Sequence, residues 1–153
     1  MPRIEAFPLQ ERYSMDSQIS RTSLRVRGYH LDGYGHVNNA RYLEFLEEGR
    51  WAYFDDRPEL FRRLQRGDVA FVAVNVNIDY CAAAVAGDDL EVASRICELG
   101  RRSARMAQEI RRRGDDALVS RATITFVLLD VAANRAIPIE GELHDLLAPL
   151  VVE

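Results

Sequence analysis

The chain has 153 residues, of which 48% are hydrophobic and 29% are charged, and its formal net charge is −4 at pH 7. This length and composition fit one globular domain that needs neither a disulfide nor a metal to fold. The acidic balance leaves no electrostatic footprint for nucleic acid, so we exclude a nucleic-acid partner. We find no apolar run near the roughly 20 residues of a membrane span and no secretory signal, so we expect a cytoplasmic protein without a membrane span.

The first part of the chain divides into an extension and the start of a domain. Residues 1–20 show no sustained period, and we interpret them as an N-terminal extension ahead of a single domain over residues 21–153. Residues 22–31 alternate in polarity, which predicts a short strand. The strand runs into a glycine-rich turn that begins at Asp32.

A long helix is predicted between Asn38 and Asp56, because apolar residues recur there at helical spacing. Asn38 or Asn39 can cap its first turn. Gly49 lies on the main apolar stripe, where a glycine weakens a helix, so we interpret it as a point of close contact with a sheet. Apolar residues also occupy a second face, so we expect the helix to be sandwiched. A short helix beginning at Pro58 follows.

From Val69 onward the apolar period changes to two, and turn residues divide the segment into four strands. We expect an antiparallel meander, a loop over residues 131–138 and a closing helix over residues 140–150. One helix sandwiched by an antiparallel sheet is an α+β fold. On the first of these strands the alternation places the following residues on one buried face: Val72, Val74, Val76, Ile78 and Tyr80.

The junction between the first strand and the long helix is the part richest in chemically useful side chains. The start of a helix presents free N–H donors and the positive end of its dipole, which can stabilise charge on a carbonyl oxygen. A carboxylate just upstream, such as Asp32, can attack that carbonyl or activate a water. Taken singly, Asp32 is an ordinary turn residue, His36 a packed or solvated imidazole, and Arg41 either a ligand contact or one half of an ion pair.

The run from Asp32 to Phe45, Asp-Gly-Tyr-Gly-His-Val-Asn-Asn-Ala-Arg-Tyr-Leu-Glu-Phe, resembles the signature of the 4-hydroxybenzoyl-CoA thioesterase-like branch of the hot-dog superfamily. Within that branch it is most similar to the bacterial long-chain acyl-CoA thioesterase type. The resemblance implies a curved antiparallel sheet wrapped around one long helix. It also implies a homodimer or homotetramer with the site at the dimer interface, and no metal or cofactor, since CoA is part of the substrate.

The same resemblance implies a role for each residue of the junction. The activity is hydrolysis of a medium- to long-chain acyl-CoA to the free acid and CoA. Asp32 acts as nucleophile or general base, and the backbone N–H of Asn39 polarises the thioester carbonyl. The expected substrate-binding residues are Tyr34, His36, Asn38, Arg41 and Glu47.

Some features of the sequence keep alternatives open. Plant acyl-carrier-protein thioesterases carry an asparagine where this chain has Tyr34, which disfavours a carrier-protein substrate without excluding it. A non-catalytic acyl-CoA-binding protein would keep the same pocket. Glu47 is a rival catalytic carboxylate, and His30 with His36 is a weak candidate metal pair. Relatives often have a basic residue and a proline where this chain has residues 81–86, so the candidate phosphate contacts are Arg101, Arg102 and Arg105, or Arg111 to Arg113.

Overall fold

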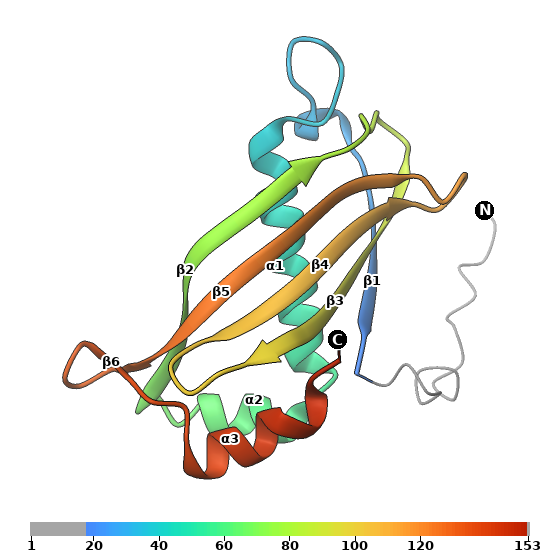
Figure 1. Ribbon diagram of the computed structural model, residues 1–153. Coiled ribbons are helices and arrows are strands. Elements are labelled where there is room, and N and C mark those ends of the chain that lie inside the picture. Colours follow the sequence, from blue (N-terminus) through green and yellow to red (C-terminus); the bar gives the residue numbers. More distant parts are fainter. Residues whose placement is uncertain (1–17, 153) are drawn as a thin grey trace.

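The computed structural model describes residues 18–152, in which a curved antiparallel sheet wraps around one long helix (Figure 1). This architecture confirms the predicted α+β hot-dog fold. The expected extension, residues 1–20, lies almost wholly outside the described residues, although the first strand already begins at Ser20. The elements are β1 (Ser20–Arg25), a 3-10 turn (Gly28–His30), α1 (Asn39–Asp55), α2 (Pro58–Leu64), β2 (Val69–Tyr80), β3 (Asp89–Leu99), β4 (Ala104–Arg112), β5 (Leu118–Asp130), β6 (Arg135–Ile137), α3 (Gly141–Leu147) and a 3-10 turn (Ala148–Leu150).

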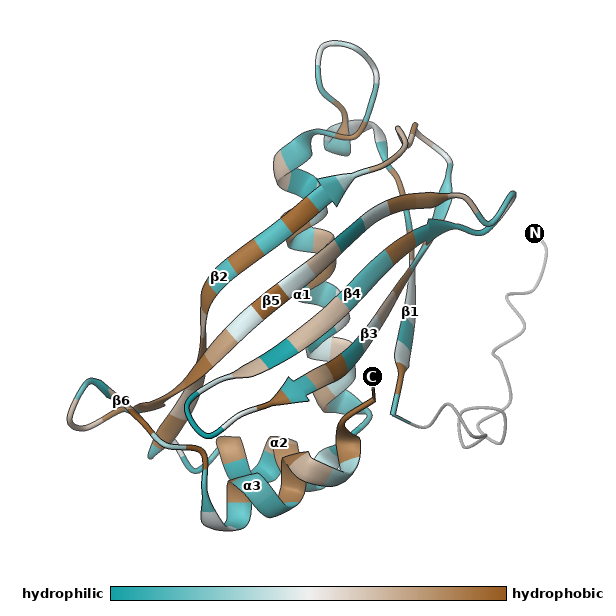
Figure 2. Ribbon diagram, in the orientation of Figure 1, coloured by the Kyte–Doolittle hydropathy of each residue, from teal (hydrophilic) through white to brown (hydrophobic). Residues whose placement is uncertain are grey.

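The strands follow the order β1-β3-β4-β5-β2, with β6 paired to the end of β5. The predicted meander is therefore present in β3, β4 and β5, whereas β2 pairs with β5 and becomes an edge of the sheet. Residues along the strands alternate between hydrophobic and hydrophilic (Figure 2). Within residues 18–152 no helix combines the length and the apolar character needed to span a bilayer.

One face of α1 packs against β1, β3 and β4. The contact is close at Gly49, where an added Cβ atom would lie 2.6 Å from Cγ1 of Val92 and 3.0 Å from Nε2 of Gln108. Gln108 is buried, and its amide donates to the carbonyl of Leu46 (2.9 Å) and to Oγ of Ser94 (2.8 Å). The glycine therefore lets the helix settle onto the sheet, as its position on the apolar stripe predicted. The buried residues of this face are Tyr42, Phe45, Leu46, Gly49 and Tyr53.

Two local expectations were wrong in their boundaries. The first strand ends at Arg25 instead of continuing to residue 31, because a 3-10 turn forms over Gly28–His30. The ring of His30 stabilises this turn, since its Nδ1 accepts the backbone N–H of Arg27 at 2.8 Å. The expected loop over residues 131–138 contains the short strand β6, which pairs with the end of β5.

The predicted single face of β2 was also wrong, because the strand contains a β-bulge. Its pairing with β5 passes from Ala73–Phe126 to Asn75–Thr125, so Val74 has no partner and the alternation changes phase there. Val76 shares the helix-facing side with buried Ile124. The helix-facing residues of β2 are Phe71, Ala73, Val76, Ile78 and Tyr80.

Part of the apolar surface expected to be buried is open in the single chain. On β2, Val74 is 56% exposed and Val76 is 42% exposed. On the second apolar face of α1, Leu43 and Trp51 are 43% and 53% exposed. One chain alone therefore covers only one side of α1. The helix would be sandwiched, as expected, only if a ligand or a second chain covered its other apolar face.

Candidate active site

A five-residue loop, Asp32 to His36, projects beyond the end of the sheet next to the start of α1 (Figure 1). An antiparallel bridge between Leu31 and Val37 closes its base. Val37 also donates its N–H to the carbonyl of Ala84 at 2.9 Å, which anchors the base to the rest of the chain. The loop is thus held at both ends while its tip reaches into solvent.

Asp32 organises this loop through its own side chain. Its Oδ1 accepts the backbone N–H of Tyr34 at 2.8 Å and that of His36 at 3.3 Å, and its own N–H donates to the carbonyl of His36 at 2.8 Å. Among residues 18–152 its second oxygen, Oδ2, makes no hydrogen bond. The carboxylate is therefore fixed through one oxygen and available through the other.

The start of α1 presents the donor that the chemistry needs. Asn38 caps the helix, with its Oδ1 accepting the N–H of Ala40 at 3.0 Å. The N–H of Asn39 donates to no acceptor within the described part of the chain, and it lies at the positive end of the helix dipole. Tyr80, at the end of β2, donates its hydroxyl to the carbonyl of Asn39 at 3.2 Å, which ties the first turn to the sheet.

The two histidines near the junction occupy different environments. His30 is buried, with its ring edge-to-face against Phe45 at 5.0 Å. Burial, assisted by the positive charge of Arg41, lowers the pKa of His30, so the ring is held neutral. His36 is exposed and takes part in the loop through its backbone. Among residues 18–152 no group of three or more His, Cys, Asp or Glu side chains is placed to hold a metal ion.

The structure does not bring every expected residue to the junction. Arg41 forms an ion pair with Glu44 at 2.9 Å and donates to the carbonyl of Tyr29 at 3.3 Å, so it braces the segment before the loop. Glu47 is exposed, and it lies about 12 Å along the helix axis from Asn39 at the usual rise per residue. Glu47 therefore lies outside the immediate reach of the Asn39 donor in the same chain.

Sequence patterns did not single out two polar residues between α1 and the sheet. Arg50 is half-buried, donates from Nη1 to Oε1 of Gln108 at 3.1 Å, and lies 6.0 Å above the ring of Phe126. Burial lowers the pKa of Arg50. The sequence did contain a sign of this position: Leu43, Arg50 and Phe54 are spaced so that all three lie on one side of the helix, which places Arg50 among apolar residues.

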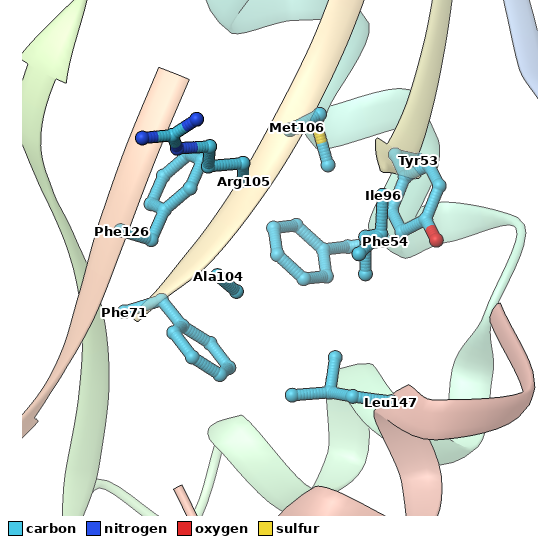
Figure 3. A pocket seen from close by; sticks show the side chains of 9 residues that line it. All are labelled: Tyr53, Phe54, Phe71, Ile96, Ala104, Arg105, Met106, Phe126 and Leu147. Atoms are coloured by element: carbon cyan, nitrogen blue, oxygen red, sulfur yellow. The ribbon is translucent and has the colours of Figure 1, made fainter. Parts of the chain in front are cut away.

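An aromatic cavity of about 30 Å³ lies between the C-terminal end of α1 and the sheet. Figure 3 shows Phe54, Phe71 and Leu147 converging on it from three different elements. A second, polar cavity of about 210 Å³ is lined by β2, β3, β4 and β5 residues that include Asp79, Arg95 and Arg121. Neither of these two cavities is lined by Asp32, which is half-buried.

The arginines considered for phosphate contacts fall into two groups. Arg105, Arg111 and Arg112 each form an ion pair with a neighbouring carboxylate, at 3.4, 3.3 and 2.9 Å respectively, and Arg113 donates to Oγ of Ser23 at 3.1 Å. Arg101 and Arg102 are exposed and have no ion pair within residues 18–152. These two side chains are therefore the ones whose charge is available to a ligand.

Comparison with known proteins identifies the family of this chain. Residues 26–147 match the family described as the thioesterase-like superfamily. The chain is 43% identical to the long-chain acyl-CoA thioesterase FadM of Escherichia coli over 131 residues, which are 86% of this chain and 98% of that protein. It is 31% identical to the acyl-CoA thioesterase YbgC of Haemophilus influenzae over 125 residues, 78% of this chain and 89% of that protein.

A solved structure gives the same result. The crystal structure of the probable thioesterase YbaW from Escherichia coli superposes with a TM-score of 0.80 at 42% identity, covering 87% of this chain and 99% of that one. The predicted family and the hot-dog fold are thus confirmed together. The chain belongs to the thioesterase-like superfamily.

Proposed function

We propose that this protein hydrolyses long-chain acyl-CoA thioesters to the free acid and CoA. The observation that carries the proposal is the pairing of two groups at one junction. Within residues 18–152, Asp32 has one free carboxylate oxygen in a braced loop, and the N–H of Asn39, at the start of the helix that follows, has no acceptor. The identity to the long-chain acyl-CoA thioesterase of Escherichia coli supports the substrate class.

The chemistry assigns a distinct task to each group. The thioester oxygen accepts a hydrogen bond from the Asn39 N–H, which stabilises the negative charge that develops as the carbonyl carbon becomes tetrahedral. Asp32 then acts by one of two routes. Its free oxygen attacks the carbon and expels the CoA thiolate, after which water cleaves the acyl anhydride; or it removes a proton from a water that attacks the carbon directly. Both routes end in one carboxylic acid and one CoA thiol.

The remaining expected residues shape the surroundings of these two groups. Asn38 caps the helix and so sets the direction of its first free N–H groups. Tyr34 is 90% exposed at the loop tip, and His36 lies beside it. Exposed aromatic side chains of this kind gain most when a ligand or a second chain covers them. Arg101 and Arg102 lie in the turn between β3 and β4, at the opposite end of the sheet from the Asp32 loop (Figure 1), so we propose that they contact the phosphates of a CoA bound at the junction of a second chain.

We also propose that the active form is a homodimer joined through β2. This twelve-residue strand is an edge of the sheet, and an exposed apolar edge is a template for pairing with another chain. Val72, Val74 and Val76 are 37%, 56% and 42% exposed on it. Pairing two such edges would make one continuous sheet and cover the loop end that a single chain leaves open.

The role of Asp32 is tested by substitution. Asp32→Asn keeps the shape of the side chain, and we expect kcat/KM for palmitoyl-CoA, measured as thiol release, to fall by about a hundredfold or more. Asp55→Asn, at an exposed position of α1, serves as the control and should leave turnover unchanged. Full activity in Asp32→Asn, together with loss of activity in Glu47→Gln, would show that Glu47 and not Asp32 is the catalytic carboxylate.

Substrate assays separate the proposed activity from its rivals. A protein that binds palmitoyl-CoA tightly but releases no thiol over several hours is an acyl-CoA-binding protein and not an enzyme. A clear preference for palmitoyl-acyl-carrier-protein over palmitoyl-CoA would assign the carrier-linked substrate instead. We expect thiol release with CoA as the preferred acyl carrier.

The dimer is tested at the edge strand. Val74→Lys places a charge on β2, and we expect sedimentation to show dissociation with loss of turnover while circular dichroism remains that of a folded chain. Val131→Lys is the matched control, because Val131 is 47% exposed just after β5. If the Val74→Lys variant remained fully dimeric and active, the proposal that the dimer forms through β2 would be wrong.

A further inference from the structure

Apart from its buried stripe, α1 has a second side that this chain leaves open. Leu43, Glu47, Arg50 and Phe54 recur at spacings of three and four residues, so they line one side of the helix. Their order leads from the Asn39 end of α1 to the end next to the aromatic cavity. We call these four residues the open side of α1.

The sheet faces this region with apolar side chains. The register of β2 and β5 turns Val76, Ile124 and Phe126 toward the helix side of the sheet. Val76 nevertheless remains 42% exposed, although the end of β2 contacts the first turns of α1 through Tyr80. An extended hydrocarbon that starts at Asn39 can therefore run along the open side of α1 in contact with apolar groups.

Arg50 is the cation on this path. Its Nη1 is fixed by Oε1 of Gln108 at 3.1 Å, and the amide of Gln108 is in turn fixed by Ser94 and by the carbonyl of Leu46. Within residues 18–152 the other guanidinium N–H groups have no hydrogen-bond acceptor. The position of the charge is thus set by a buried network, while part of its donor capacity stays available.

Space beyond Arg50 is restricted. Phe126, above which the guanidinium lies at 6.0 Å, is also a wall of the aromatic cavity. That cavity has a volume of about 30 Å³, which is enough for about one water and too little for further methylene groups. Arg50 itself lies about 16 Å along the helix axis from Asn39, a distance comparable to an extended long-chain acyl group. The far end of such a chain would therefore stop beside Arg50.

We propose that Arg50 is a specificity-determining residue that recognises an oxygen acceptor, a carboxylate or a hydroxyl, at the distal end of the acyl chain. The inference rests on the proposed acyl-CoA hydrolysis and deepens it by naming the substrate class. An acyl chain that ends in a methyl group would leave the free N–H groups of a half-buried cation without an acceptor, whereas a terminal oxygen would pair with them.

Glu47 does not already fulfil this role. Burial lowers the pKa of Arg50 and the negative charge of Glu47, one turn away, only opposes that lowering; no ion pair joins the two side chains within the described residues. A carboxylate that acts only at a distance leaves the donors of Arg50 free for direct contact. The methylene stem of Arg50 can meanwhile lie along the hydrocarbon.

The first test uses substrates alone. Thiol release is measured for palmitoyl-CoA, for its ω-hydroxy derivative and for its ω-carboxy derivative. We expect kcat/KM to be about tenfold higher for at least one of the two oxygenated chains, the gain that one hydrogen bond to a charged group supplies. The two derivatives show whether the neutral or the anionic acceptor is preferred.

The second test changes the cation. Arg50→Met keeps an unbranched apolar stem, and the preference for the oxygenated chain should fall to about one, while palmitoyl-CoA is still hydrolysed. Arg50→Lys keeps a charge and should keep part of the preference, so it serves where loss of the Gln108 contact harms folding of the methionine variant. Arg62→Met, at an exposed position of α2, is the matched control and should retain the full preference.

The outcomes separate this inference from the proposed function. No thiol release from any of the three thioesters would overturn the proposed function itself. Efficient hydrolysis of palmitoyl-CoA at a rate equal to or above that of both oxygenated chains would overturn only the role of Arg50. A preference that persists unchanged in a folded Arg50→Met protein would overturn it as well.

Discussion

The two sides of α1 differ in how much of their environment this chain supplies. The buried stripe packs against β1, β3 and β4, closely enough at Gly49 to exclude a Cβ atom, and both donors of the Gln108 amide beside it have acceptors. The open side keeps Leu43 at 43% exposure and Arg50 with unused donors. The first side is covered by this chain as folded, whereas the second has surface that only a ligand or another chain can cover.

This difference separates stability from function along one helix. Burial of the closed side supplies apolar free energy whether or not any substrate is present. The exposed part of the open side, at Leu43 and Glu47, supplies little to folding, so these side chains are available for contact with a ligand. The loop that carries Asp32 lies next to the N-terminal end of α1. Packing of the closed side holds the helix, and therefore the N–H groups of its first turn, in place beside this loop.

Shortening one leucine on each side of α1 tests whether the two sides differ in burial. Leu46 is fully buried, and Leu46→Ala should lower the free energy of unfolding by about 3 kcal/mol through lost burial and a residual cavity. Leu43→Ala should lower it by less than about 1 kcal/mol, because much of that side chain is exposed. Urea denaturation measures both values, and equal losses would mean that the two sides are buried alike in the native assembly.

A smaller effect is expected from the close contact at Gly49. Gly49→Ala gains about 1 kcal/mol in helix propensity but places a Cβ atom 2.6 Å from Cγ1 of Val92 and 3.0 Å from the fixed amide of Gln108. Overpacking of this kind costs about 1–3 kcal/mol, so we expect a net loss near 1 kcal/mol. Glu48→Ala, at the exposed neighbouring position, is the control. A Gly49→Ala variant more stable than wild type would show that the sheet side chains in contact with Gly49 can move aside to make room for a methyl group.

Local patterns predicted the closed side well. The bounds of α1, its cap at Asn38 and the contact at Gly49 follow from helical spacing and capping chemistry, which depend on neighbours in the sequence. The Asp32 loop was recognised through a motif of contiguous residues, although its role remains a prediction. These features share one property, that the residues which define them are close along the chain.

Long-range pairing was what the sequence did not reveal. The bulge at Val74 arises from the register of β2 against β5, and an alternation of valines contains no sign of it. The hydroxyl of Tyr80 reaches Asn39 across 41 positions, and Arg50 reaches Gln108 across 58. Such contacts depend on the curvature of the sheet and on which face a strand presents, so they appear only once the fold is assembled.

The smallest expected effect concerns His30, which joins the closed side to the loop. Its burial, with the nearby charges of Arg41 and Arg27, lowers its pKa below the usual 6.5, against an opposing effect of Glu44. The unfolded chain therefore binds a proton first as the pH falls, so the stability that the neutral ring supplies is complete above about pH 6.5 and is lost as the pH drops through the folded-state pKa. Protonation also removes the Nδ1 acceptor of the Arg27 N–H.

His30→Asn tests this dependence, because its side-chain oxygen can occupy the place of Nδ1 without titrating. We expect the melting temperature of wild type to fall between about pH 8 and about pH 5.5 by a few degrees more than that of His30→Asn. His144→Asn, on the exposed face of α3, should behave as wild type. Equal acid sensitivity in all three proteins would show that the His30 ring does not couple the junction to pH, and the loop would then owe its position to backbone contacts alone.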